Sequence, residues 1–239
     1  MSNLIDFETI FNNFFHKKQT KTLHETLANY TDHSLIPGGD NGSFYTHINY
    51  HTMKQALIEL IKQNKSFNIF VETGCSAHGT KSTLLWDKVI NLIGGKVISV
   101  DLDPNAVHIT NNNTSSKTNV ICSDSLLFLP SLTETIDFID FLYLDSYDVD
   151  FLNPLLSAEH HLKEFNCVKH LLHKGSIILI DDTPYSPEWL DNGKYSPIYN
   201  QLKTQFNHNL SGKGSLVNKE LEKMGATKIM HQYQILWIL

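Results

Sequence analysis

The sequence predicts an α/β fold in which a mostly parallel, doubly wound sheet is covered by helices on both faces. Short apolar segments of strand length recur along the chain, and segments with apolar residues at helical spacing separate them. Strands buried on both faces are continuously apolar, and parallel strands need long, usually helical crossovers between them. With 239 residues, the chain is long enough for one such domain with a sizeable core.

Five segments are expected to form the parallel strands, because each is continuously apolar or rich in β-branched residues. These segments are 68–73, 96–100, 118–122, 138–144 and 176–180. Helices are expected where apolar residues recur every three or four positions. The helical segments are 80–93, one that begins near 104, 125–129, 154–173 and 215–224. Gly94 and Gly95 end the first of these helices, and Gly175 follows the helix at 154–173.

Two further segments flank this sheet. At the C-terminus, 228–230 and 234–239 are expected to form a hairpin that adds antiparallel strands to the sheet. At the N-terminus, residues 1–65 lie outside a minimal nucleotide-binding sheet, and we expect them to form a helical cap or lid on a core at 66–239, with a loop that closes over a bound acceptor. The expected elements of this cap are helices at 4–15, 22–30 and 51–63 and a glycine- and aromatic-rich loop at 34–50.

The composition excludes several classes of protein. The net charge is −6 and no run of Lys or Arg forms a basic stripe, so no nucleic acid is expected as a partner. Three isolated cysteines argue against a disulfide framework or a thiolate zinc site. No membrane span or signal peptide is visible, so we expect a cytoplasmic protein without membrane contact. Homo-oligomer formation stays open.

The segment 68–104 predicts a site for a nucleoside cofactor. A buried strand leads into a turn of small residues that begins at Gly74, a helix follows, and the next strand ends at Asp101. Such a turn lets a ligand approach backbone N–H groups, and an acid 20–30 residues on binds a ribose diol. The spacing of Gly74 and Gly79 fits neither the dinucleotide fingerprint nor the P-loop. Glu72 would repel a pyrophosphate but suits a cofactor with an ammonium and a sulfonium.

The residues Glu72, Gly74 and Gly79 resemble motif I of the class I S-adenosylmethionine (SAM) methyltransferases, although Ser76 and Ala77 stand where that family has its second glycine. The closing hairpin also resembles that family. The resemblance covers 66–239 and implies a Rossmann-like, mostly parallel sheet of seven strands with an antiparallel C-terminal hairpin. It also implies a set of cofactor-binding residues. They are Glu72, Gly74, Ser76, Gly79, Thr80, Lys81, Asp101, Asp124 and Ser125.

Three carboxylates are expected to carry the chemistry. Asp145 ends one predicted strand, and Asp181 and Asp182 end the next. These strand ends meet at the ligand crevice of a doubly wound sheet, where the carboxylates would repel one another unless a cation compensates them. Oxygen ligands of this kind suit Mg²⁺, with Mn²⁺ or Ca²⁺ as alternatives. The arrangement resembles the metal-dependent O-methyltransferases of the catechol and macrocin types.

That resemblance implies methylation of a hydroxyl on a small molecule such as a sugar or secondary metabolite, with the metal lowering the hydroxyl pKa. The alternative within enzymes is a metal-independent methyltransferase, in which Asp145, His160 or His161 acts as general base. A non-catalytic module that only binds the nucleoside is the alternative from another class. The loop around Lys213 either binds an anionic group of the acceptor or merely precedes the last helix.

Overall fold

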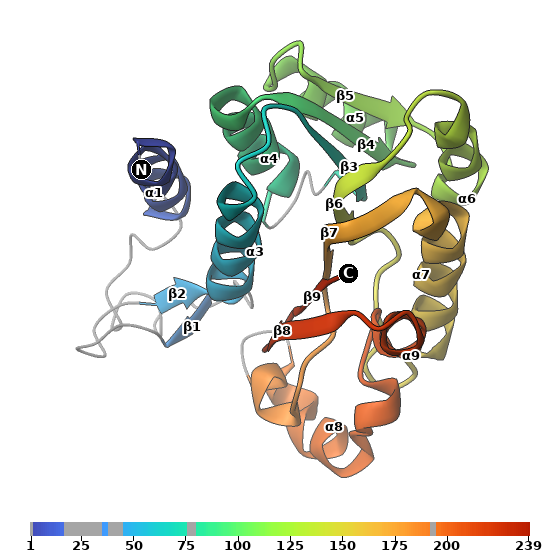
Figure 1. Cartoon of the computed structure of the whole chain (residues 1–239). Helices are drawn as coiled ribbons and strands as arrows, with labels where there is room; N and C mark the ends of the chain where they lie inside the picture. Colours follow the sequence, from blue (N-terminus) through green and yellow to red (C-terminus); the bar gives the residue numbers. More distant parts are fainter. Residues whose placement is uncertain (1, 17–34, 38–44, 76–79, 192–194) are drawn as a thin grey trace.

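The computed structural model of this protein describes residues 2–16, 35–37, 45–75, 80–191 and 195–239 (Figure 1). Its main feature is a seven-stranded sheet with the order β5-β4-β3-β6-β7-β9-β8. The strands are β3 (Asn68–Thr73), β4 (Gly95–Asp101), β5 (Thr118–Cys122), β6 (Ile139–Leu144), β7 (Leu172–Ile180), β8 (Thr227–His231) and β9 (Ile235–Ile238). Strands β3 to β7 are parallel, and β9 is antiparallel to both β7 and β8. The predicted doubly wound sheet and its C-terminal hairpin are confirmed.

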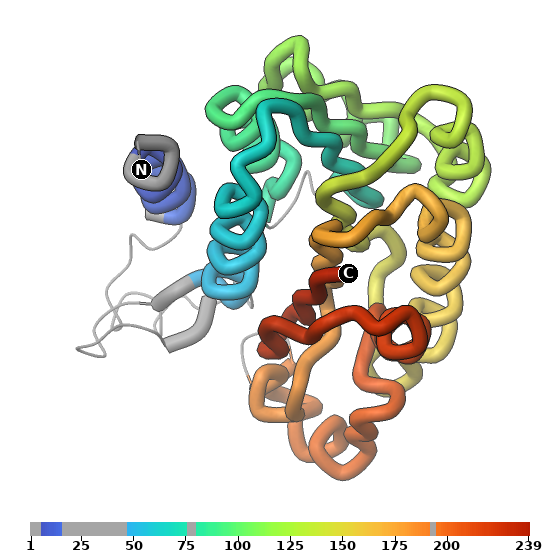
Figure 2. The backbone as a smooth tube through the Cα atoms, in the orientation of Figure 1, coloured from blue at the N-terminus to red at the C-terminus, as the bar shows by residue number. Residues whose placement is uncertain are grey.

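Helices cover both faces of this sheet. On one face lie α1 (Ser2–His16), α3 (Tyr50–Lys62) and α4 (Ser82–Ile93), and on the other lie η1 (Leu129–Glu134), α7 (Leu155–Val168) and α9 (Ser215–Lys223). The remaining helical elements are α5 (Pro104–Asn112), α6 (Ser125–Phe128), η2 (Lys169–Leu171), η3 (Pro187–Leu190), η4 (Ser196–Ile198), α8 (Tyr199–Gln205) and η5 (His208–Leu210). Figure 2 shows how the C-terminal strand runs back into the sheet beside β7.

The alternation of side chains explains why the strands read as continuous apolar runs. In β6, Phe141 and Tyr143 face the cluster under α3 and α4, whereas Leu142 and Leu144 face the cluster under α7. All six residues of β6 are buried. Both faces are therefore core, as expected of a parallel strand in the middle of a sheet.

The N-terminal helices belong to the same core as the sheet. Phe7, Phe11 and Phe15 of α1 are fully buried in the cluster that also contains Trp86 of α4. Lys54 of α3 forms an ion pair with Glu8 across a distance of 3.5 Å. An N-terminal helical extension packed on the core is what the sequence predicts, and closure of this cap over a ligand stays a prediction.

Two local predictions were wrong. The helix predicted at 154–173 ends at Val168, and β7 begins at Leu172, so Gly175 lies inside the strand with φ of +97°. The apolar residues at 171–172 fit the periodicity of a helix as well as that of a strand. The pairing of Leu172 with Ile139 makes this segment the start of a strand. The segment predicted as a loop at 34–50 contains a two-stranded sheet, β1 (Leu35–Pro37) and β2 (Tyr45–His47). The helix predicted at 22–30 lies outside the described residues.

Within the described part of the chain, every helix is too short or too polar to span a lipid bilayer.

Gly95 and Gly225 offer a test of how tightly the sheet is packed. Both have positive φ, but a Cβ on Gly95 would lie 1.9 Å from the carbonyl oxygen of Asn68, whereas one on Gly225 would meet nothing within 4 Å. We expect Gly225→Ala to lower the free energy of unfolding by about 1–2 kcal/mol, the ordinary cost of a left-handed residue. Gly95→Ala should lower it by about 3 kcal/mol or more, because the backbone must also move. Urea unfolding measures both, and equal losses would contradict the packing described.

Candidate functional site

The ends of β3 and β6 approach each other closely at the carboxyl edge of the sheet. Gly74 follows β3 with φ of +84°, and its N–H donates to the carbonyl of Val100 over 2.8 Å. A Cβ at this position would lie 2.5 Å from the carbonyl oxygen of Asp145. Only glycine fits here, because both the backbone conformation and the space exclude a side chain.

A pocket of about 100 Å³ opens at this edge, where the order of the strands reverses around β3. In a doubly wound sheet this is the position of a bound nucleoside. The lining residues are Gly74, Val100, Asp101, Leu102, Ser123, Asp124, Ser125, Ser146, Tyr147 and His160. Four predicted cofactor-binding residues, at 74, 101, 124 and 125, are therefore together in one pocket. Ser76 and Gly79 lie outside the described residues.

Backbone hydrogen bonds fix the acids of this pocket. Asp101 accepts from the N–H of Cys75 over 2.9 Å and from the N–H of Asp103 over 2.8 Å, one bond at each carboxylate oxygen. Each oxygen keeps a second lone pair for a ribose hydroxyl. Asp124 accepts from the N–H of Leu126 over 2.8 Å and so caps α6 while it also lines the pocket. The cap and the ligand contact are compatible for Asp124.

Glu72 has a different environment from the one that the sequence suggests. Its carboxylate is buried and accepts hydrogen bonds from four side chains of α4 and β4. The donors are Ser82 (2.6 Å), Thr83 (2.5 Å), Trp86 (2.7 Å) and Ser99 (2.8 Å). Burial raises the pKa of Glu72, and these four hydrogen bonds oppose the increase. Glu72 thus ties β3 to α4 and β4, and it does not line the pocket described above.

Two other predicted cofactor residues lie at the start of α4. Thr80 is buried, and its hydroxyl accepts a hydrogen bond from the Asn49 amide over 3.2 Å. Lys81 is exposed and precedes the helix with φ of +54°. Neither of them lines the pocket, and their contact with a cofactor stays a prediction.

The two histidines of α7 differ in access. His160 lines the pocket of about 100 Å³, where its ring lies 5.1 Å from that of Tyr147 and its Nε2 lies 3.2 Å from Glu164 Oε1. His161 is fully buried, and burial lowers its pKa to about 4. At neutral pH His161 is therefore uncharged and packed inside the core. This location favours a structural role for His161 over that of a general base.

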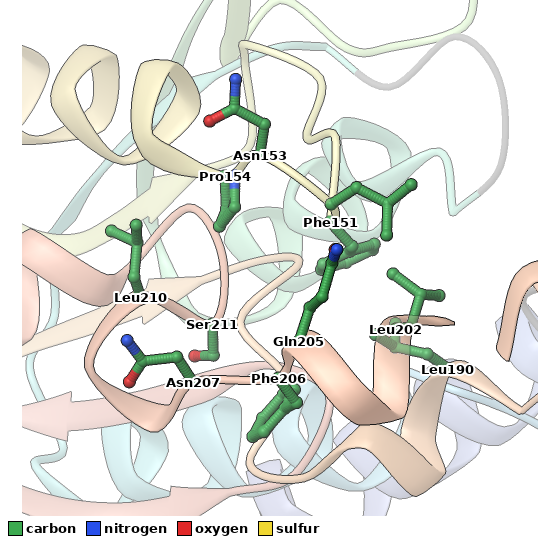
Figure 3. Close-up of a pocket in the computed structure, with 11 residues that line it drawn as sticks. Phe151, Asn153, Pro154, Leu190, Leu202, Gln205, Phe206, Asn207, Leu210 and Ser211 are labelled. Carbon is green, nitrogen blue, oxygen red and sulfur yellow. The ribbon is translucent and has the colours of Figure 1, made fainter. Parts of the chain in front are cut away.

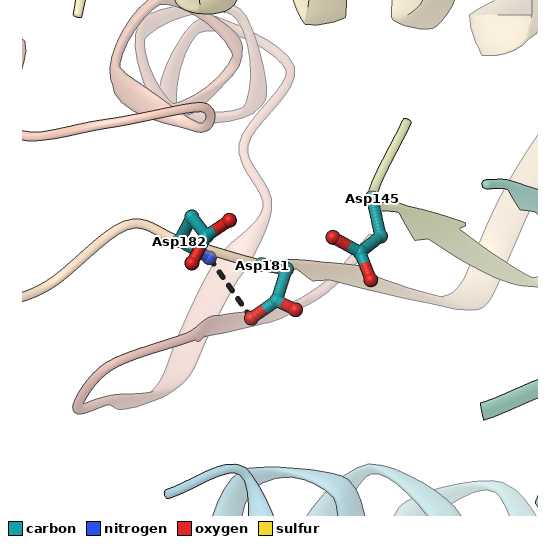
Figure 4. A group of neighbouring side chains, drawn as sticks. All are labelled: Asp145, Asp181 and Asp182. Atoms are coloured by element: carbon teal, nitrogen blue, oxygen red, sulfur yellow. Dashed lines mark hydrogen bonds between the residues drawn. The ribbon is translucent and has the colours of Figure 1, made fainter. Parts of the chain in front are cut away.

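The three predicted carboxylates do converge. Asp145 at the end of β6 and Asp181 and Asp182 at the end of β7 offer oxygen atoms that lie within 4.8 Å of one another (Figure 4). Burial raises the pKa of Asp145 and of Asp181, and the neighbouring carboxylates raise both further. The side chain of Asp145 is 12% exposed and that of Asp182 is 21% exposed. The cluster can therefore meet a ligand through these two residues.

A lysine lies among these carboxylates. The Nζ of Lys213 is 2.7 Å from Asp145 Oδ1 and 2.9 Å from Asp182 Oδ2, and its side chain is only 2% exposed. Burial would lower the pKa of Lys213, but the three carboxylates raise it well above its ordinary value. Lys213 is therefore an ammonium. The sequence drew attention to this loop, but it did not indicate that the lysine would reach the carboxylates.

A second cavity, of about 190 Å³, lies beside the same loop (Figure 3). Its wall combines apolar side chains with amide and hydroxyl groups. The lining residues are Phe151, Leu152, Asn153, Pro154, Leu190, Leu202, Gln205, Phe206, Asn207, Leu210 and Ser211. Ser211 is two residues from Lys213, and the first pocket contains Ser146, which is next to Asp145. The carboxylate cluster is thus linked through the chain to both cavities.

Comparison with known proteins rests on structure, because no family model and no curated protein matches this sequence. The O-methyltransferase NovP has a TM-score of 0.55 to this chain at 11% identity, over 99% of this chain and 98% of NovP. The O-methyltransferase TomG from Streptomyces achromogenes, in complex with SAM, has a TM-score of 0.48 at 11% identity over 78% and 79% of the two chains. The Podospora anserina methyltransferase PaMTH1, bound to S-adenosylhomocysteine, has a TM-score of 0.47 at 11% identity over 77% and 76%. The likeness to NovP confirms the predicted fold, that of the class I SAM-dependent methyltransferases.

Glu72→Gln tests whether this residue supports the turn from within. The amide cannot accept all four hydrogen bonds, and Trp86 Nε1 can only donate. We expect the free energy of unfolding to fall by about 2–3 kcal/mol. The affinity for S-adenosylhomocysteine should be unchanged in calorimetry under conditions where the variant is folded. The control is Glu222→Gln, a side chain 59% exposed, which should change stability by less than about 0.5 kcal/mol. A large loss of affinity would instead place Glu72 at the cofactor.

Proposed function

We propose that this protein is a SAM-dependent methyltransferase that methylates a hydroxyl oxygen of a small molecule. The proposal rests on two adjacent residues, Asp145 and Ser146, which directly follow β6. Ser146 lines the nucleoside pocket, and Asp145 belongs to the carboxylate cluster. A cofactor held at Asp101 and Gly74 would therefore have the charged cluster next to it. The NovP and TomG structures, both of which are O-methyltransferases, agree with this reaction type.

The proposed reaction needs positioning more than covalent participation by the protein. The acceptor oxygen attacks the methyl carbon in line with the sulfonium, the C–S bond breaks, and neutral S-adenosylhomocysteine leaves. The hydroxyl proton has to leave the acceptor oxygen. Asp145 is the candidate proton acceptor, because it is partly exposed and its raised pKa favours proton uptake. The cavity beside Ser211 is the candidate for the acceptor, since it combines apolar walls with amide groups suited to hydroxyls.

The sequence also predicts that a divalent metal at the carboxylate cluster assists the transfer. The carboxylates at 145, 181 and 182 have the ligand chemistry of Mg²⁺. The arrangement in the structure does not fit such an ion, because the ammonium of Lys213 lies between Asp145 and Asp182. The mechanism above therefore uses no step through a metal.

Asp101→Asn tests the cofactor site. The variant keeps the shape of the side chain but loses its charge, and a charged hydrogen bond contributes about 1.5–3 kcal/mol. Calorimetry should show that S-adenosylhomocysteine binds about tenfold to a hundredfold more weakly. Asp103→Asn is the matched control, because Asp103 lies two residues away, caps α5 and does not line the pocket.

The outcome decides between classes of protein. Unchanged affinity in Asp101→Asn, or tighter binding of NAD than of S-adenosylhomocysteine, would refute the cofactor. If the protein binds S-adenosylhomocysteine but transfers no methyl group to any member of a panel of sugars and phenols, a non-catalytic module that only binds the nucleoside is favoured.

A further inference from the structure

We infer that Lys213 is a resident cation that replaces the divalent metal at the carboxylate cluster, so that methyl transfer in this protein is independent of metal. The role in methyl transfer rests on the proposed function, whereas the exclusion of a metal rests on the geometry of the cluster alone. This cluster consists of Asp145, Asp181, Asp182 and Lys213.

The ammonium of Lys213 lies between the carboxylates of Asp145 and Asp182. Distances of 2.7 and 2.9 Å from Nζ to Asp145 and Asp182 are those of charge-assisted hydrogen bonds. Lys213 thereby bridges the ends of β6 and β7, which is the position that a metal shared by these strands would take. A magnesium ion needs oxygen atoms at about 2.0–2.1 Å in octahedral geometry. The ion and the ammonium cannot occupy this place together.

Protein donors surround the carboxylate oxygens of the cluster. Asp181 Oδ1 accepts from the N–H of Asp182 over 2.9 Å, and Asp182 Oδ1 accepts from the hydroxyl of Tyr233. The hydroxyl of Tyr143 lies 2.9 Å from Asp181 Oδ2 and 3.2 Å from Asp145 Oδ2. With the two bonds of Lys213, every carboxylate oxygen of the cluster lies within hydrogen-bond distance of a protein donor. The protein's own donors therefore hold these carboxylates in place without an ion, and the ammonium supplies the compensating charge.

Backbone hydrogen bonds of its loop fix the position of Lys213. Its N–H donates to the carbonyl of Asp182 over 3.0 Å, and the N–H of Gly214 donates to Thr183 Oγ1 over 2.7 Å. A Cβ on Gly212 would lie 1.8 Å from the same Asp182 carbonyl oxygen. The loop therefore lies directly on the turn that carries Asp182, and the glycine before Lys213 is required for this approach. The lysine is not a long surface side chain that has folded into a vacant site.

The chemistry follows from the charges. Three carboxylates and one ammonium leave the cluster with a net negative charge when all are ionised, so it can still accept a proton. In the proposed reaction the O–CH₃ bond forms as the S–CH₃ bond breaks, and the hydroxyl proton passes to Asp145. Lys213 compensates the cluster and holds Asp145 in place. It carries three N–H donors, of which Asp145 and Asp182 accept two, so a third can face the acceptor oxygen.

The test compares metal binding in wild type and in Lys213→Met. Mn²⁺ binding is followed by electron paramagnetic resonance, and Mg²⁺ by the melting temperature. We expect that wild type binds neither ion and that its methyl transfer is the same in EDTA as in millimolar Mg²⁺. Lys213→Met keeps most of the side-chain volume but removes the charge. We expect this variant to bind Mn²⁺ and to show a rise in melting temperature when Mg²⁺ is added. In EDTA, its turnover should be lower than that of wild type by a factor on the order of a hundred. Lys219→Met, an exposed lysine of α9, is the matched control and should behave as wild type.

Stoichiometric Mn²⁺ binding by wild type, with activity lost in EDTA, would overturn the inference and show that the ion displaces Lys213. Full turnover of Lys213→Met in EDTA would overturn it as well. If Lys213→Met does not fold, the wild-type titration still decides, because it requires no variant. The proposed function fails separately: an absence of methyl transfer under every condition would leave the metal-binding result unaffected.

Discussion

The parallel sheet brings charged residues together at one edge, and the rest of the site depends on how their repulsion is compensated. Every parallel strand leaves its carboxyl end at the same side, so the acids after β6 and β7 become neighbours in space. Three carboxylates within 4.8 Å cannot all be ionised in a partly buried site without a compensating charge. Compensation therefore has to come from protons, from a metal or from a basic side chain. The structure contains the last of these, Lys213, and its position determines which chemistry the edge can support.

The protein uses two different ways to stabilise a buried carboxylate. Glu72 accepts hydrogen bonds from three hydroxyls and an indole N–H, so its carboxylate is satisfied inside the core without a neighbouring cation in the part of the chain that the structure describes. Asp145 has a cation and a phenol as neighbours and remains 12% exposed, so it can exchange a proton with a ligand. A carboxylate thus supports the turn after β3 in one environment, whereas in the other it lies partly exposed at the carboxyl edge of the sheet. Burial and donor type, rather than sequence motif, distinguish the two.

Much of the fold could be predicted from the sequence, because strands buried on both faces leave a strong signal. The continuous apolar run that precedes Asp145 gave the strand and the position of the acid, and the strand ends then brought Asp181 and Asp182 to the same edge. What could not be predicted depends on contacts between distant segments. The boundary between α7 and β7 is set by pairing with Ile139, and the donors to Glu72 come from another helix and another strand. Lys213 reaches Asp145 from 68 positions away. A glycine on each side of that lysine was the available signal, but glycines before a helix are common and did not indicate a partner.

The arrangement of the cluster also constrains which acceptors fit the site. Asp181 is the most enclosed of the three carboxylates, and its bonds to Tyr143 and to the backbone make it a support for its neighbours. Tyr143 in turn accepts from Gln234 over 3.0 Å, so this support extends to the residue that directly precedes β9 in the antiparallel hairpin. A ligand can therefore approach only through the partly exposed Asp145 and Asp182, with the ammonium of Lys213 between them. An anionic acceptor group would lie against the carboxylate oxygens of Asp145 and Asp182, whereas a neutral hydroxyl would find both a proton acceptor and a donor. The electrostatics of the edge thus favour a neutral, hydroxylated acceptor over a phosphorylated or carboxylated one.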